Sequence, residues 1–561
     1  MSSHLANSDD DVIAAAKSWR EQDPDPETRA ELEELLADAN HGSVDALAAL
    51  RDRFATRLEF GTAGLRGEIG AGPNRMNRVL VSQAAVGLAA FLVARMDAPS
   101  AVIGYDGRRN SEVFARDTAE LMAGAGVRTI LLPRLLPTPV LAFAVRDLDA
   151  SAGVMVTASH NPGSDNGYKV YLGDADNGSQ IVPPSDGQIA EQIERVAAGD
   201  IRSFPRSTDY DRAGEDLLDR YVAATSAIGR AASQPRVVYT AMHGVGWETA
   251  RRVLLAAGFD EPTVVPQQIE PDAAFPTVLF PNPEEAGALD LAFARAAEVG
   301  AELVIANDPD ADRLAVGIPD PSGATPTGWR RLSGNEVGLL LGWRAAQRAT
   351  SGTLACSLVS SPGLAAIAKA TGLTHVETLT GFKWISRAPD LVFGFEEALG
   401  YLVNPSTVRD KDGISAALDL LSLASELKAE QRTLQDYADD IATRVGAFAS
   451  TQISLRLTEL PRIPQIMKYL REHPPTAFGT SKVSTVDDFA TGFGGFPPND
   501  ILRIWMDDGS RIVVRPSGTE PKLKVYIDAA STTGSARERF AEAGERLATL
   551  ERGMRELLAE A

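Results

Sequence analysis

The sequence contains a single cysteine, Cys356, among 561 residues. The chain can therefore form no internal disulfide, and a reducing compartment is expected. No apolar run of about 18 residues occurs, which predicts no membrane-spanning helix. The first residues show no basic segment followed by an apolar one, so no signal peptide is expected. We therefore expect a cytoplasmic protein that does not associate with a membrane.

Basic residues are the minority among the charged ones, with 55 Lys and Arg against 76 Asp and Glu and a net charge of −21. This balance argues against nucleic acid as a partner, because a phosphate backbone requires a basic face. Small phosphorylated molecules remain possible ligands, since a local cluster of Arg and Lys can bind them. A monomer or a small homo-oligomer is expected.

The chain is too long for one hydrophobic core, and its composition is typical of a globular protein. Helical spacing of apolar residues predicts an N-terminal helical extension. Strand and helix patterns then alternate in three units, which predicts mixed sheets covered by helices. The last segment is typical of an α+β domain with an antiparallel sheet and helices on one side. The expected domains span residues 1–55, 56–205, 206–325, 326–445 and 446–561.

An apolar strand pattern stops abruptly at Ser159, in the stretch GVMVTASHNPGSDNGYKVY (153–171). One interpretation is an ordinary turn, because Ser, Asn and Pro favour turns. The alternative is a nucleophilic serine presented at a strand end, where ligands bind in open α/β sheets. Such a serine needs a base, a metal or an oxyanion clamp, and His160 and Lys169 are the neighbouring candidates.

Three aspartates, Asp308, Asp310 and Asp312, alternate along the loop that follows the next buried strand, in IANDPDADR. Carboxylates with this spacing can converge on one hard cation such as Mg²⁺. An EF-hand is excluded because its sixth position would be Arg313 and its twelfth Pro319. A solvated acidic turn remains the alternative.

Two further loops carry ligand-binding chemistry. Glu396 and Glu397 follow the strand pattern LVFGF, and indicate either a solvated helix start or acceptors for sugar hydroxyls. RPSGTEPK (515–522) offers Arg, Ser, Thr and Gly, the donors that a phosphate dianion needs, although an ordinary connecting loop has the same composition. LEFGTAGLRGEIG (58–70) predicts only a Gly-rich turn.

Taken together and in this order, GTAGLRG, TASHNPGSDNGYKVY, DPDADR, TGFKWI, FEEALG and RPSGTEPKLK resemble the α-D-phosphohexomutase superfamily, which includes phosphoglucomutases and phosphomannomutases. The resemblance covers residues 55 to 530. It is strongest to the phosphoglucomutase-2/phosphopentomutase-like branch, through TGFKWI and FEEALG.

The resemblance implies four domains around a central cleft and an enzyme that interconverts hexose 1-phosphate and hexose 6-phosphate, with glucose the expected hexose. It implies a phosphoserine, Mg²⁺, and a bound 1,6-bisphosphate intermediate that also serves as activator. It assigns catalysis to Ser159, Arg66, His160, Lys169 and Lys383; metal binding to Ser159, Asp308, Asp310 and Asp312; and substrate binding to Arg313, Glu396, Arg515, Ser517, Gly518 and Thr519.

One position departs from the pattern of many hexomutases. They carry a serine two residues after the sugar-binding glutamate, where this chain has Ala398. One contact to the sugar is lost, so a phosphomannomutase, a phosphopentomutase or a 1,6-bisphosphate synthase is an alternative. A non-catalytic phosphosugar-binding protein is the more distant alternative.

Overall fold

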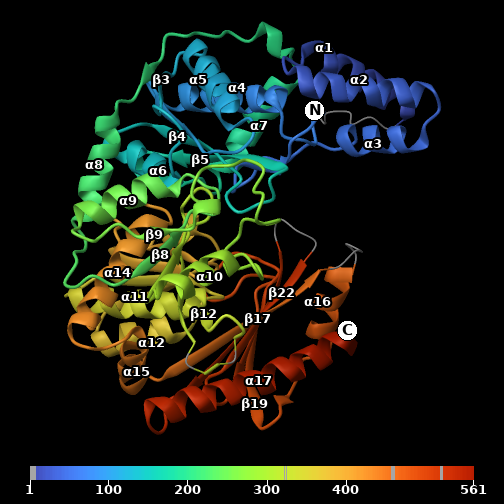
Figure 1. Ribbon diagram of the computed structural model, residues 1–561. Helices are drawn as coiled ribbons and strands as arrows, with labels where there is room; N and C mark the ends of the chain where they lie inside the picture. The colour runs from blue at the N-terminus through green and yellow to red at the C-terminus, as the bar shows by residue number, and fades with distance from the viewer. Residues whose placement is uncertain (1–7, 321, 324, 457–461, 518–521, 561) are drawn as a thin grey trace. The chain divides into compact units, whose positions relative to one another are not determined.

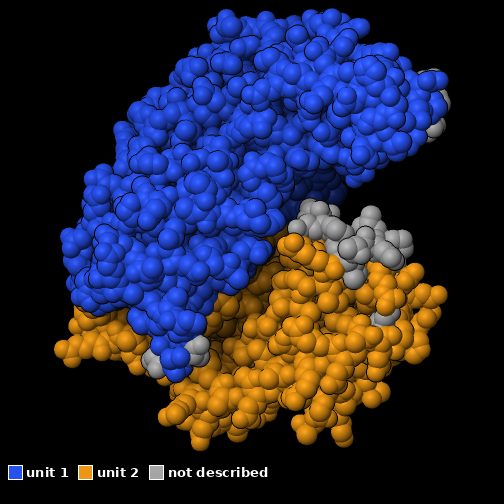
Figure 2. Space-filling model, turned by 45° about the vertical axis from the view of Figure 1, so that its right-hand side comes forward, with its two compact units in different colours: residues 1–332, 382–387, 399–425 blue, residues 333–381, 388–398, 426–561 orange. Residues whose placement is uncertain are grey.

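The computed structural model of the protein describes residues 8–320, 322–323, 325–456, 462–517 and 522–560 (Figure 1). The chain divides into two compact units, which Figure 2 colours separately. The first unit contains residues 1–332, 382–387 and 399–425, and the second contains residues 333–381, 388–398 and 426–561.

The first unit begins with three helices in the stretch for which the sequence predicts helices: α1 (Asp9–Gln22), α2 (Pro26–Asn40) and α3 (Val44–Phe54). Each begins at a side-chain cap, Ser8, Asp25 or Ser43, that accepts a hydrogen bond from the first turn. Their apolar faces form one buried cluster around Leu32 and Leu50.

The first sheet follows, with spatial order β1-β5-β4-β2-β3-β7 and β6 paired to β5. Strands β2, β3, β4 and β7 are parallel, whereas β5 is antiparallel to β1 and β4. The strands are β1 (Leu65–Glu68), β2 (Ser100–Tyr105), β3 (Arg128–Leu131), β4 (Ala152–Val156), β5 (Asp165–Leu172), β6 (Ser179–Gln180) and β7 (Asp211–Arg212). The helices are α4 (Arg78–Arg95), α5 (Ser111–Gly124), α6 (Thr138–Asp147) and α7 (Ser185–Ala197), with 3-10 turns at Asp174–Asp176 and Ile201–Ser203.

Helices cover both faces of this sheet. The helices α4, α5 and α7 share one buried cluster with alternate residues of β2 and β4, and α6 packs on the opposite face. A Cβ at Gly153 of β4 would lie 2.4 Å from the Val145 side chain of α6, so this close approach depends on glycine. The arrangement is the covered mixed sheet that the alternating sequence pattern predicts.

Helix α4 is long and apolar enough to cross a membrane by length and composition alone. However, 67% of its 18-residue window is buried inside the protein, where it packs on α5 and α7. This burial is typical of the core helix of a globular domain.

The second sheet has the spatial order β12-β11-β10-β8-β9. Its strands are β8 (Val237–Thr240), β9 (Thr263–Val264), β10 (Leu303–Ala306), β11 (Ala315–Pro319) and β12 (Trp329–Arg331). β8, β9 and β10 are parallel, and β11 and β12 continue as an antiparallel edge. The helices of this part are α8 (Glu215–Ser226), α9 (Gly246–Ala256), α10 (Asp290–Val299) and the 3-10 turn Pro266–Gln268. Residues from farther along the chain complete the unit as α13 (Phe382–Ile385), β16 (Gly400–Leu402) and most of α14 (Gly413–Ala429).

The second unit contains two sheets. In one, β13 (Thr353–Ser357) pairs in parallel with β14 (Thr374–Thr378) and β15 (Leu391–Glu396). Its helices are α11 (Gly334–Arg348), α12 (Gly363–Thr371) and α15 (Leu434–Val445).

The other sheet is antiparallel throughout, with order β17-β22-β21-β20-β19-β18. Its strands are β17 (Ala447–Arg456), β18 (Ala477–Phe478), β19 (Ser481–Asp488), β20 (Leu502–Met506), β21 (Arg511–Pro516) and β22 (Lys522–Ser531). Helices α16 (Arg462–Glu472) and α17 (Ala536–Glu560) pack into one core on the same face. The other face contributes Val513 and Tyr526 to a smaller core with Leu358 and Val359.

The Gly-rich stretch 58–70 contains a strand, β1, where the sequence predicted only a turn. One of the glycines, Gly64, allows the chain to lie close to β5. Gly64 has φ +76°, and a Cβ there would lie 1.8 Å from the Tyr168 carbonyl oxygen. This glycine therefore serves close packing within the sheet.

Candidate active site

Ser159 lies three residues after the end of β4, in a turn. Its backbone is left-handed, with φ 54°, which is uncommon for a residue other than glycine. Thr157 Oγ1 accepts a 2.8 Å hydrogen bond from Ser159 N, and Ser159 Oγ lies 3.2 Å from His160 Nδ1. The hydroxyl donates to Asp308 Oδ2 at 2.9 Å. The turn therefore directs the serine hydroxyl at the acidic loop of the second sheet.

The acidic loop converges on one point. One ligand oxygen from each of Asp308, Asp310 and Asp312 lies within 4.8 Å of the others. All three side chains are fully buried, which contradicts the interpretation as a solvated acidic turn. Arg313 N donates to Asp308 Oδ1 at 2.9 Å, and Ala311 adopts φ 56° to close the loop.

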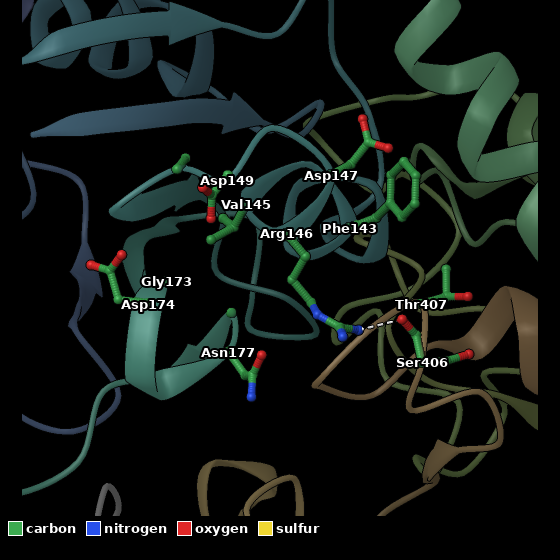
Figure 3. Close-up of a pocket in the computed structure, with 12 residues that line it drawn as sticks. Phe143, Val145, Arg146, Asp147, Asp149, Gly173, Asp174, Asn177, Ser406 and Thr407 are labelled. Carbon is green, nitrogen blue, oxygen red and sulfur yellow. Dashed lines mark hydrogen bonds between the residues drawn. The ribbon is translucent and has the colours of Figure 1, made fainter.

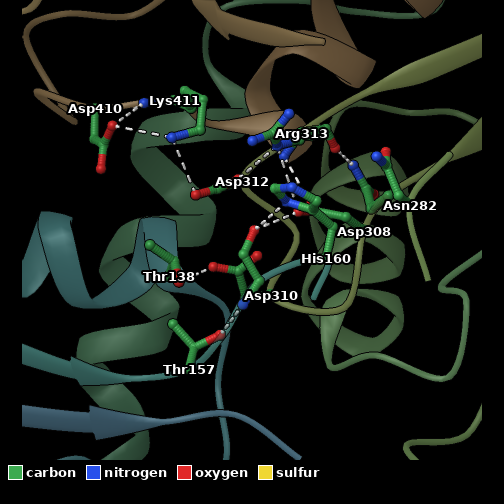
Figure 4. Close-up of polar contacts among 12 residues, drawn as sticks. Thr138, Thr157, His160, Asn282, Asp308, Asp310, Asp312, Arg313, Asp410 and Lys411 are labelled. Carbon is green, nitrogen blue, oxygen red and sulfur yellow. Dashed lines mark hydrogen bonds and ion pairs between the residues drawn. The ribbon is translucent and has the colours of Figure 1, made fainter. Parts of the chain in front are cut away.

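Asp310 and Asp312 each have one oxygen that accepts hydrogen bonds, whereas the other accepts none from the described residues (Figure 4). Arg313 Nε lies 4.0 Å from the second oxygen of Asp312, Oδ1. Lys169 Nζ donates to Asp310 Oδ2 at 2.7 Å and to Asp312 Oδ2 at 2.9 Å. Thr138 Oγ1 also donates to Asp310 Oδ2, and Lys411 Nζ lies 3.3 Å from Asp312 Oδ2. Among the described residues, nothing donates to the buried Oδ1 atoms of Asp310 and Asp312. Such oxygens fit a hard cation.

The electrostatics of the loop agree with a cation. Burial and the neighbouring carboxylates of Asp310 and Asp312 raise the pKa of Asp308 well above its usual value. Burial opposes ionisation of Asp312 as well, but Lys169 and Lys411 hold the pKa of that carboxyl far below its usual range. A divalent cation would offset the remaining repulsion among the three carboxylates.

Further cationic side chains lie around the serine loop. Arg66, on β1, donates from Nη1 to Asn161 Oδ1 at 3.3 Å. Lys383, on α13, donates to Thr62 Oγ1, four residues before Arg66. Burial and the nearby guanidinium groups of Arg313 and Arg66 lower the pKa of His160 well below its usual value. The imidazole beside Ser159 Oγ is therefore neutral.

Sequence reasoning missed three residues of this region, Arg108, Thr138 and Lys411. Arg108 follows β2 and Thr138 follows β3, so the position of parallel strand ends could have indicated both. Arg108 donates to four backbone carbonyls of the serine loop and contacts the Phe275 ring. Lys411 precedes α14, and no local pattern indicates that it lies beside Asp312.

The predicted sugar-binding residue belongs to the second unit. Glu396 is the last residue of β15 and is buried, and a turn follows it, so the pair does not begin a helix. The adjacent Glu397 accepts hydrogen bonds from Ser357 Oγ at 3.1 Å and Ser360 Oγ at 2.9 Å. Glu397 is therefore held by its own unit.

The predicted phosphate loop also belongs to the second unit. Arg515, on β21, donates to Thr380 Oγ1 and, from Nε, to the carbonyl of Pro516 at 3.3 Å. Ser517 N donates to the carbonyl of Lys522 at 2.8 Å. Gly518 and Thr519 lie outside the described residues.

A separate cavity of about 360 Å³ lies in the first unit between the end of α6, the turn after β5 and residues 406–407 (Figure 3). Arg146 reaches across to the carbonyl of Ser406, at 2.6 Å. The side chains described around it include none of the predicted site residues.

Four family models match the chain in order. Residues 57–199, 219–321 and 333–445 match the alpha/beta/alpha domains I, II and III of phosphoglucomutase/phosphomannomutase, and residues 463–543 match its C-terminal domain. The chain belongs to the α-D-phosphohexomutase superfamily. It is therefore a member of a family of phosphotransferase isomerases, which confirms the predicted enzyme class.

Individual relatives of this phosphohexomutase agree with that assignment. It is 53% identical over 487 residues to the "Probable phosphomannomutase" of Haemophilus influenzae, covering 86% of this chain and 98% of the relative. It is 35% identical to the phosphopentomutase of Mus musculus, covering 92% and 90%. A solved phosphoglucomutase/phosphomannomutase family protein from Burkholderia thailandensis has a TM-score of 0.66 at 20% identity, covering 87% and 96%. The predicted fold of three α/β domains followed by an α+β domain is confirmed.

Proposed function

We propose that this phosphohexomutase interconverts hexose 1-phosphate and hexose 6-phosphate through a phosphoserine at Ser159. The observation that carries the proposal is the 2.9 Å hydrogen bond from Ser159 Oγ to Asp308, in a buried cluster of three carboxylates. A serine held at a strand end beside such a cluster has what phosphoryl transfer requires, because that chemistry depends mainly on positioning and electrostatics.

The proposed metal ligands are Asp308, Asp310 and Asp312, with a phosphate oxygen on Ser159 completing the set. Oxygen ligands and several open positions suit Mg²⁺. When bound, the cation would neutralise part of the roughly −1.5 to −2 charge of a phosphoserine.

Two transfers make up the proposed cycle. In the first, the bond between phosphorus and Ser159 Oγ breaks, and a bond forms to the free hydroxyl oxygen of a hexose 1-phosphate. The hydroxyl proton passes to a basic side chain, and a proton returns to Ser159 Oγ. The bound 1,6-bisphosphate then turns over. In the second transfer the bond between phosphorus and sugar O1 breaks and a bond from phosphorus to Ser159 Oγ forms. The serine proton passes to a basic side chain and a proton is returned to O1, which leaves hexose 6-phosphate.

Other predicted residues have supporting roles in this proposal. Lys169 and Lys383 are the candidate proton carriers, His160 supports the serine, and Arg66 stabilises the phosphoryl group in flight. Glu396 binds sugar hydroxyls, and Arg313 contributes positive charge at the metal loop. The clamp for the non-reacting phosphate consists of Arg515, Ser517, Gly518 and Thr519.

Limited access of water would protect the phosphoserine from hydrolysis in this scheme. Ser159 is only 2% exposed, and a bound sugar phosphate would have to present its hydroxyl there in place of water. A phosphoryl enzyme that excludes water while the sugar is bound returns its phosphoryl group to the sugar, which is the behaviour of a mutase.

The proposal also concerns which sugar phosphate is the preferred substrate. Glucose is the expected hexose, and the likeness to a relative named for mannose and another for pentose keeps those sugars as competitors. Ala398 supports this breadth, because the position offers no hydroxyl to the sugar. Initial rates on glucose 1-phosphate, mannose 1-phosphate and ribose 1-phosphate with Mg²⁺ would rank the three substrates.

Intact-protein mass spectrometry tests the nucleophile. Incubation with glucose 1,6-bisphosphate and Mg²⁺ should add one phosphoryl group, and peptide mapping should place it on Ser159. Ser159→Ala should abolish both the mass gain and turnover. Ser164→Ala removes an exposed serine from the same loop and should retain both. Equal turnover by wild type and Ser159→Ala would rule out the phosphoserine.

A further inference from the structure

The three N-terminal helices lie before residue 57, where the first family match begins. They do not fold apart from the first sheet domain. Ala71 and Val79, from the chain around the start of α4, and Ile201 are buried in the same cluster as the helices. The helices and the loop that follows β1 therefore share one core.

Polar contacts tie the helices to that loop, residues 69–77. Glu31, on α2, accepts a 2.8 Å hydrogen bond from Ala71 N through Oε2, and its Oε1 pairs with Arg53 of α3. The carbonyl of Arg53 in turn accepts from Asn74 N at 3.1 Å. A Cβ at Gly72, where φ is +103°, would lie 3.0 Å from the Arg53 Cβ. The loop is thus fitted closely against α2 and α3.

The same loop folds back on β1. Met76 N donates to the carbonyl of Glu68 at 2.8 Å, and Gly70 N donates to the carbonyl of Met76 at 3.1 Å. Ile69 N donates to the carbonyl of Ser164 at 2.9 Å, which joins the loop to the serine loop. Arg66 precedes these contacts by only a few residues along β1. Its position therefore depends on how the loop is held.

We propose that α1–α3 are a positioning element for the phosphoryl-transfer site, and that Glu31 is its positioning residue. Glu31 fixes the loop that ends β1, and β1 in turn places the Arg66 guanidinium beside Asn161 of the serine loop. The proposal rests on the proposed function, because Arg66 is the group through which Glu31 acts. A scaffold that only adds stability is the competing explanation.

The first test compares Glu31→Ala with Glu34→Ala, an exposed glutamate on the same helix. A shift of about 1 Å at a reacting group can lower a rate by about 100-fold, so a partial shift of Arg66 should lower kcat by roughly tenfold. KM for the sugar phosphate should change by less than about twofold, since Arg66 is assigned to the phosphoryl group in flight. Glu34→Ala should match wild type in both constants.

The second test separates positioning from stability through a double-mutant cycle with Arg66→Ala. If Glu31 acts through Arg66, adding Glu31→Ala to Arg66→Ala should lower kcat no further. Multiplicative effects of the two changes would overturn the proposal, as would an unchanged kcat in Glu31→Ala. Glu31→Gln keeps an acceptor for Ala71 N and should lower kcat by about threefold. It allows the same cycle if the alanine variant does not fold.

Failure of the proposed function would give a different experimental result from failure of the positioning role. Wild type would then turn over none of the sugar phosphates, or Ser159→Ala would turn them over as fast as wild type. A wild type that is active, with a Glu31→Ala variant equally active, rejects only the positioning role.

Discussion

Replacing Arg108 by methionine should destabilise the first sheet domain and slow catalysis together. Arg108 is 4% exposed. From Nη2 it donates to the carbonyls of Ser159 at 2.7 Å and Asn161 at 2.6 Å, and from Nη1 to those of Pro162 at 2.7 Å and Asp165 at 3.1 Å. One guanidinium thus holds the backbone of the whole serine loop.

The magnitude follows from the burial of these groups. Each hydrogen bond to a charged group contributes about 1.5–3 kcal/mol, but four such values overcount, because effects within one network are not additive. The side chain also lies 3.6 Å from Asp106, which is itself buried. Removing one partner of a buried ion pair costs about 3–5 kcal/mol, and we expect Arg108→Met to lower the free energy of unfolding by that amount. For a domain of this size, the unfolding midpoint should fall by roughly 6–20 °C.

Calorimetry and steady-state kinetics would measure the two effects, with Arg109→Met as the control. Arg109 is exposed and pairs with Glu27 on the surface, so its loss should cost less than about 1 kcal/mol. Adding Asp106→Asn to Arg108→Met removes the uncompensated carboxylate charge and should recover part of the lost stability. It should not recover kcat, because the backbone carbonyls of the serine loop still lack their hydrogen-bond donor. Wild-type stability and kcat in Arg108→Met, or recovery of kcat in the double variant, would refute the reasoning.

Two further outcomes are expected. Mg²⁺ at 100 times its Kd should stabilise the first unit by about 2.7 kcal/mol, which raises the unfolding midpoint in a thermal scan by roughly 5–10 °C. EDTA should reverse this shift and abolish turnover. A shift of the same size in Asp310→Asn would argue against the proposed metal site. In Gly244→Ala the new Cβ would lie 2.2 Å from Pro309 Cα in the metal loop, so stability should fall by about 1–3 kcal/mol and kcat should fall with it. As a control, Gly187→Ala in α7 places its Cβ in open space and should leave the free energy of unfolding unchanged or slightly higher. Equal free energies of unfolding for the two glycine variants in denaturant titrations would contradict the predicted clash at Pro309.

Much of the fold is predictable because its parallel strands are short, fully buried apolar runs. β2, β4, β8 and β10 each appear as such a run in the sequence, and turn residues follow them. β1 was missed because the glycines around it resemble a turn, whereas one of them, Gly64, permits contact with β5. Helix α16 was not identified either, because Pro464 interrupts its pattern near the start. For both β1 and α16, tertiary packing determines a backbone conformation that the local composition does not predict.

The candidate site was predictable where its chemistry is concentrated in one stretch. The alternating aspartates and the serine after β4 are local patterns, and strand ends bring them together. Lys411 could not be found in this way, since only the packing of the first unit brings it to Asp312. The position of Arg108 after β2 could have indicated it, but its contacts to backbone carbonyls carry no sequence signature.

The division of oxygen atoms on Asp310 and Asp312 gives two lysines a role in the proposed metal site. Lys169 lies on β5 opposite Met155 of β4, so the antiparallel pairing that displays the serine also delivers an ammonium group to the aspartates. Lys169 and Lys411 contact the Oδ2 atoms, which fixes the carboxylates, and no described residue donates a hydrogen bond to either Oδ1 atom. Three carboxylates alone would repel one another and spread. In the proposed mechanism the two ammonium groups would keep the ligand oxygens close before Mg²⁺ binds, and that preorganisation would lower the cost of charge stabilisation during transfer.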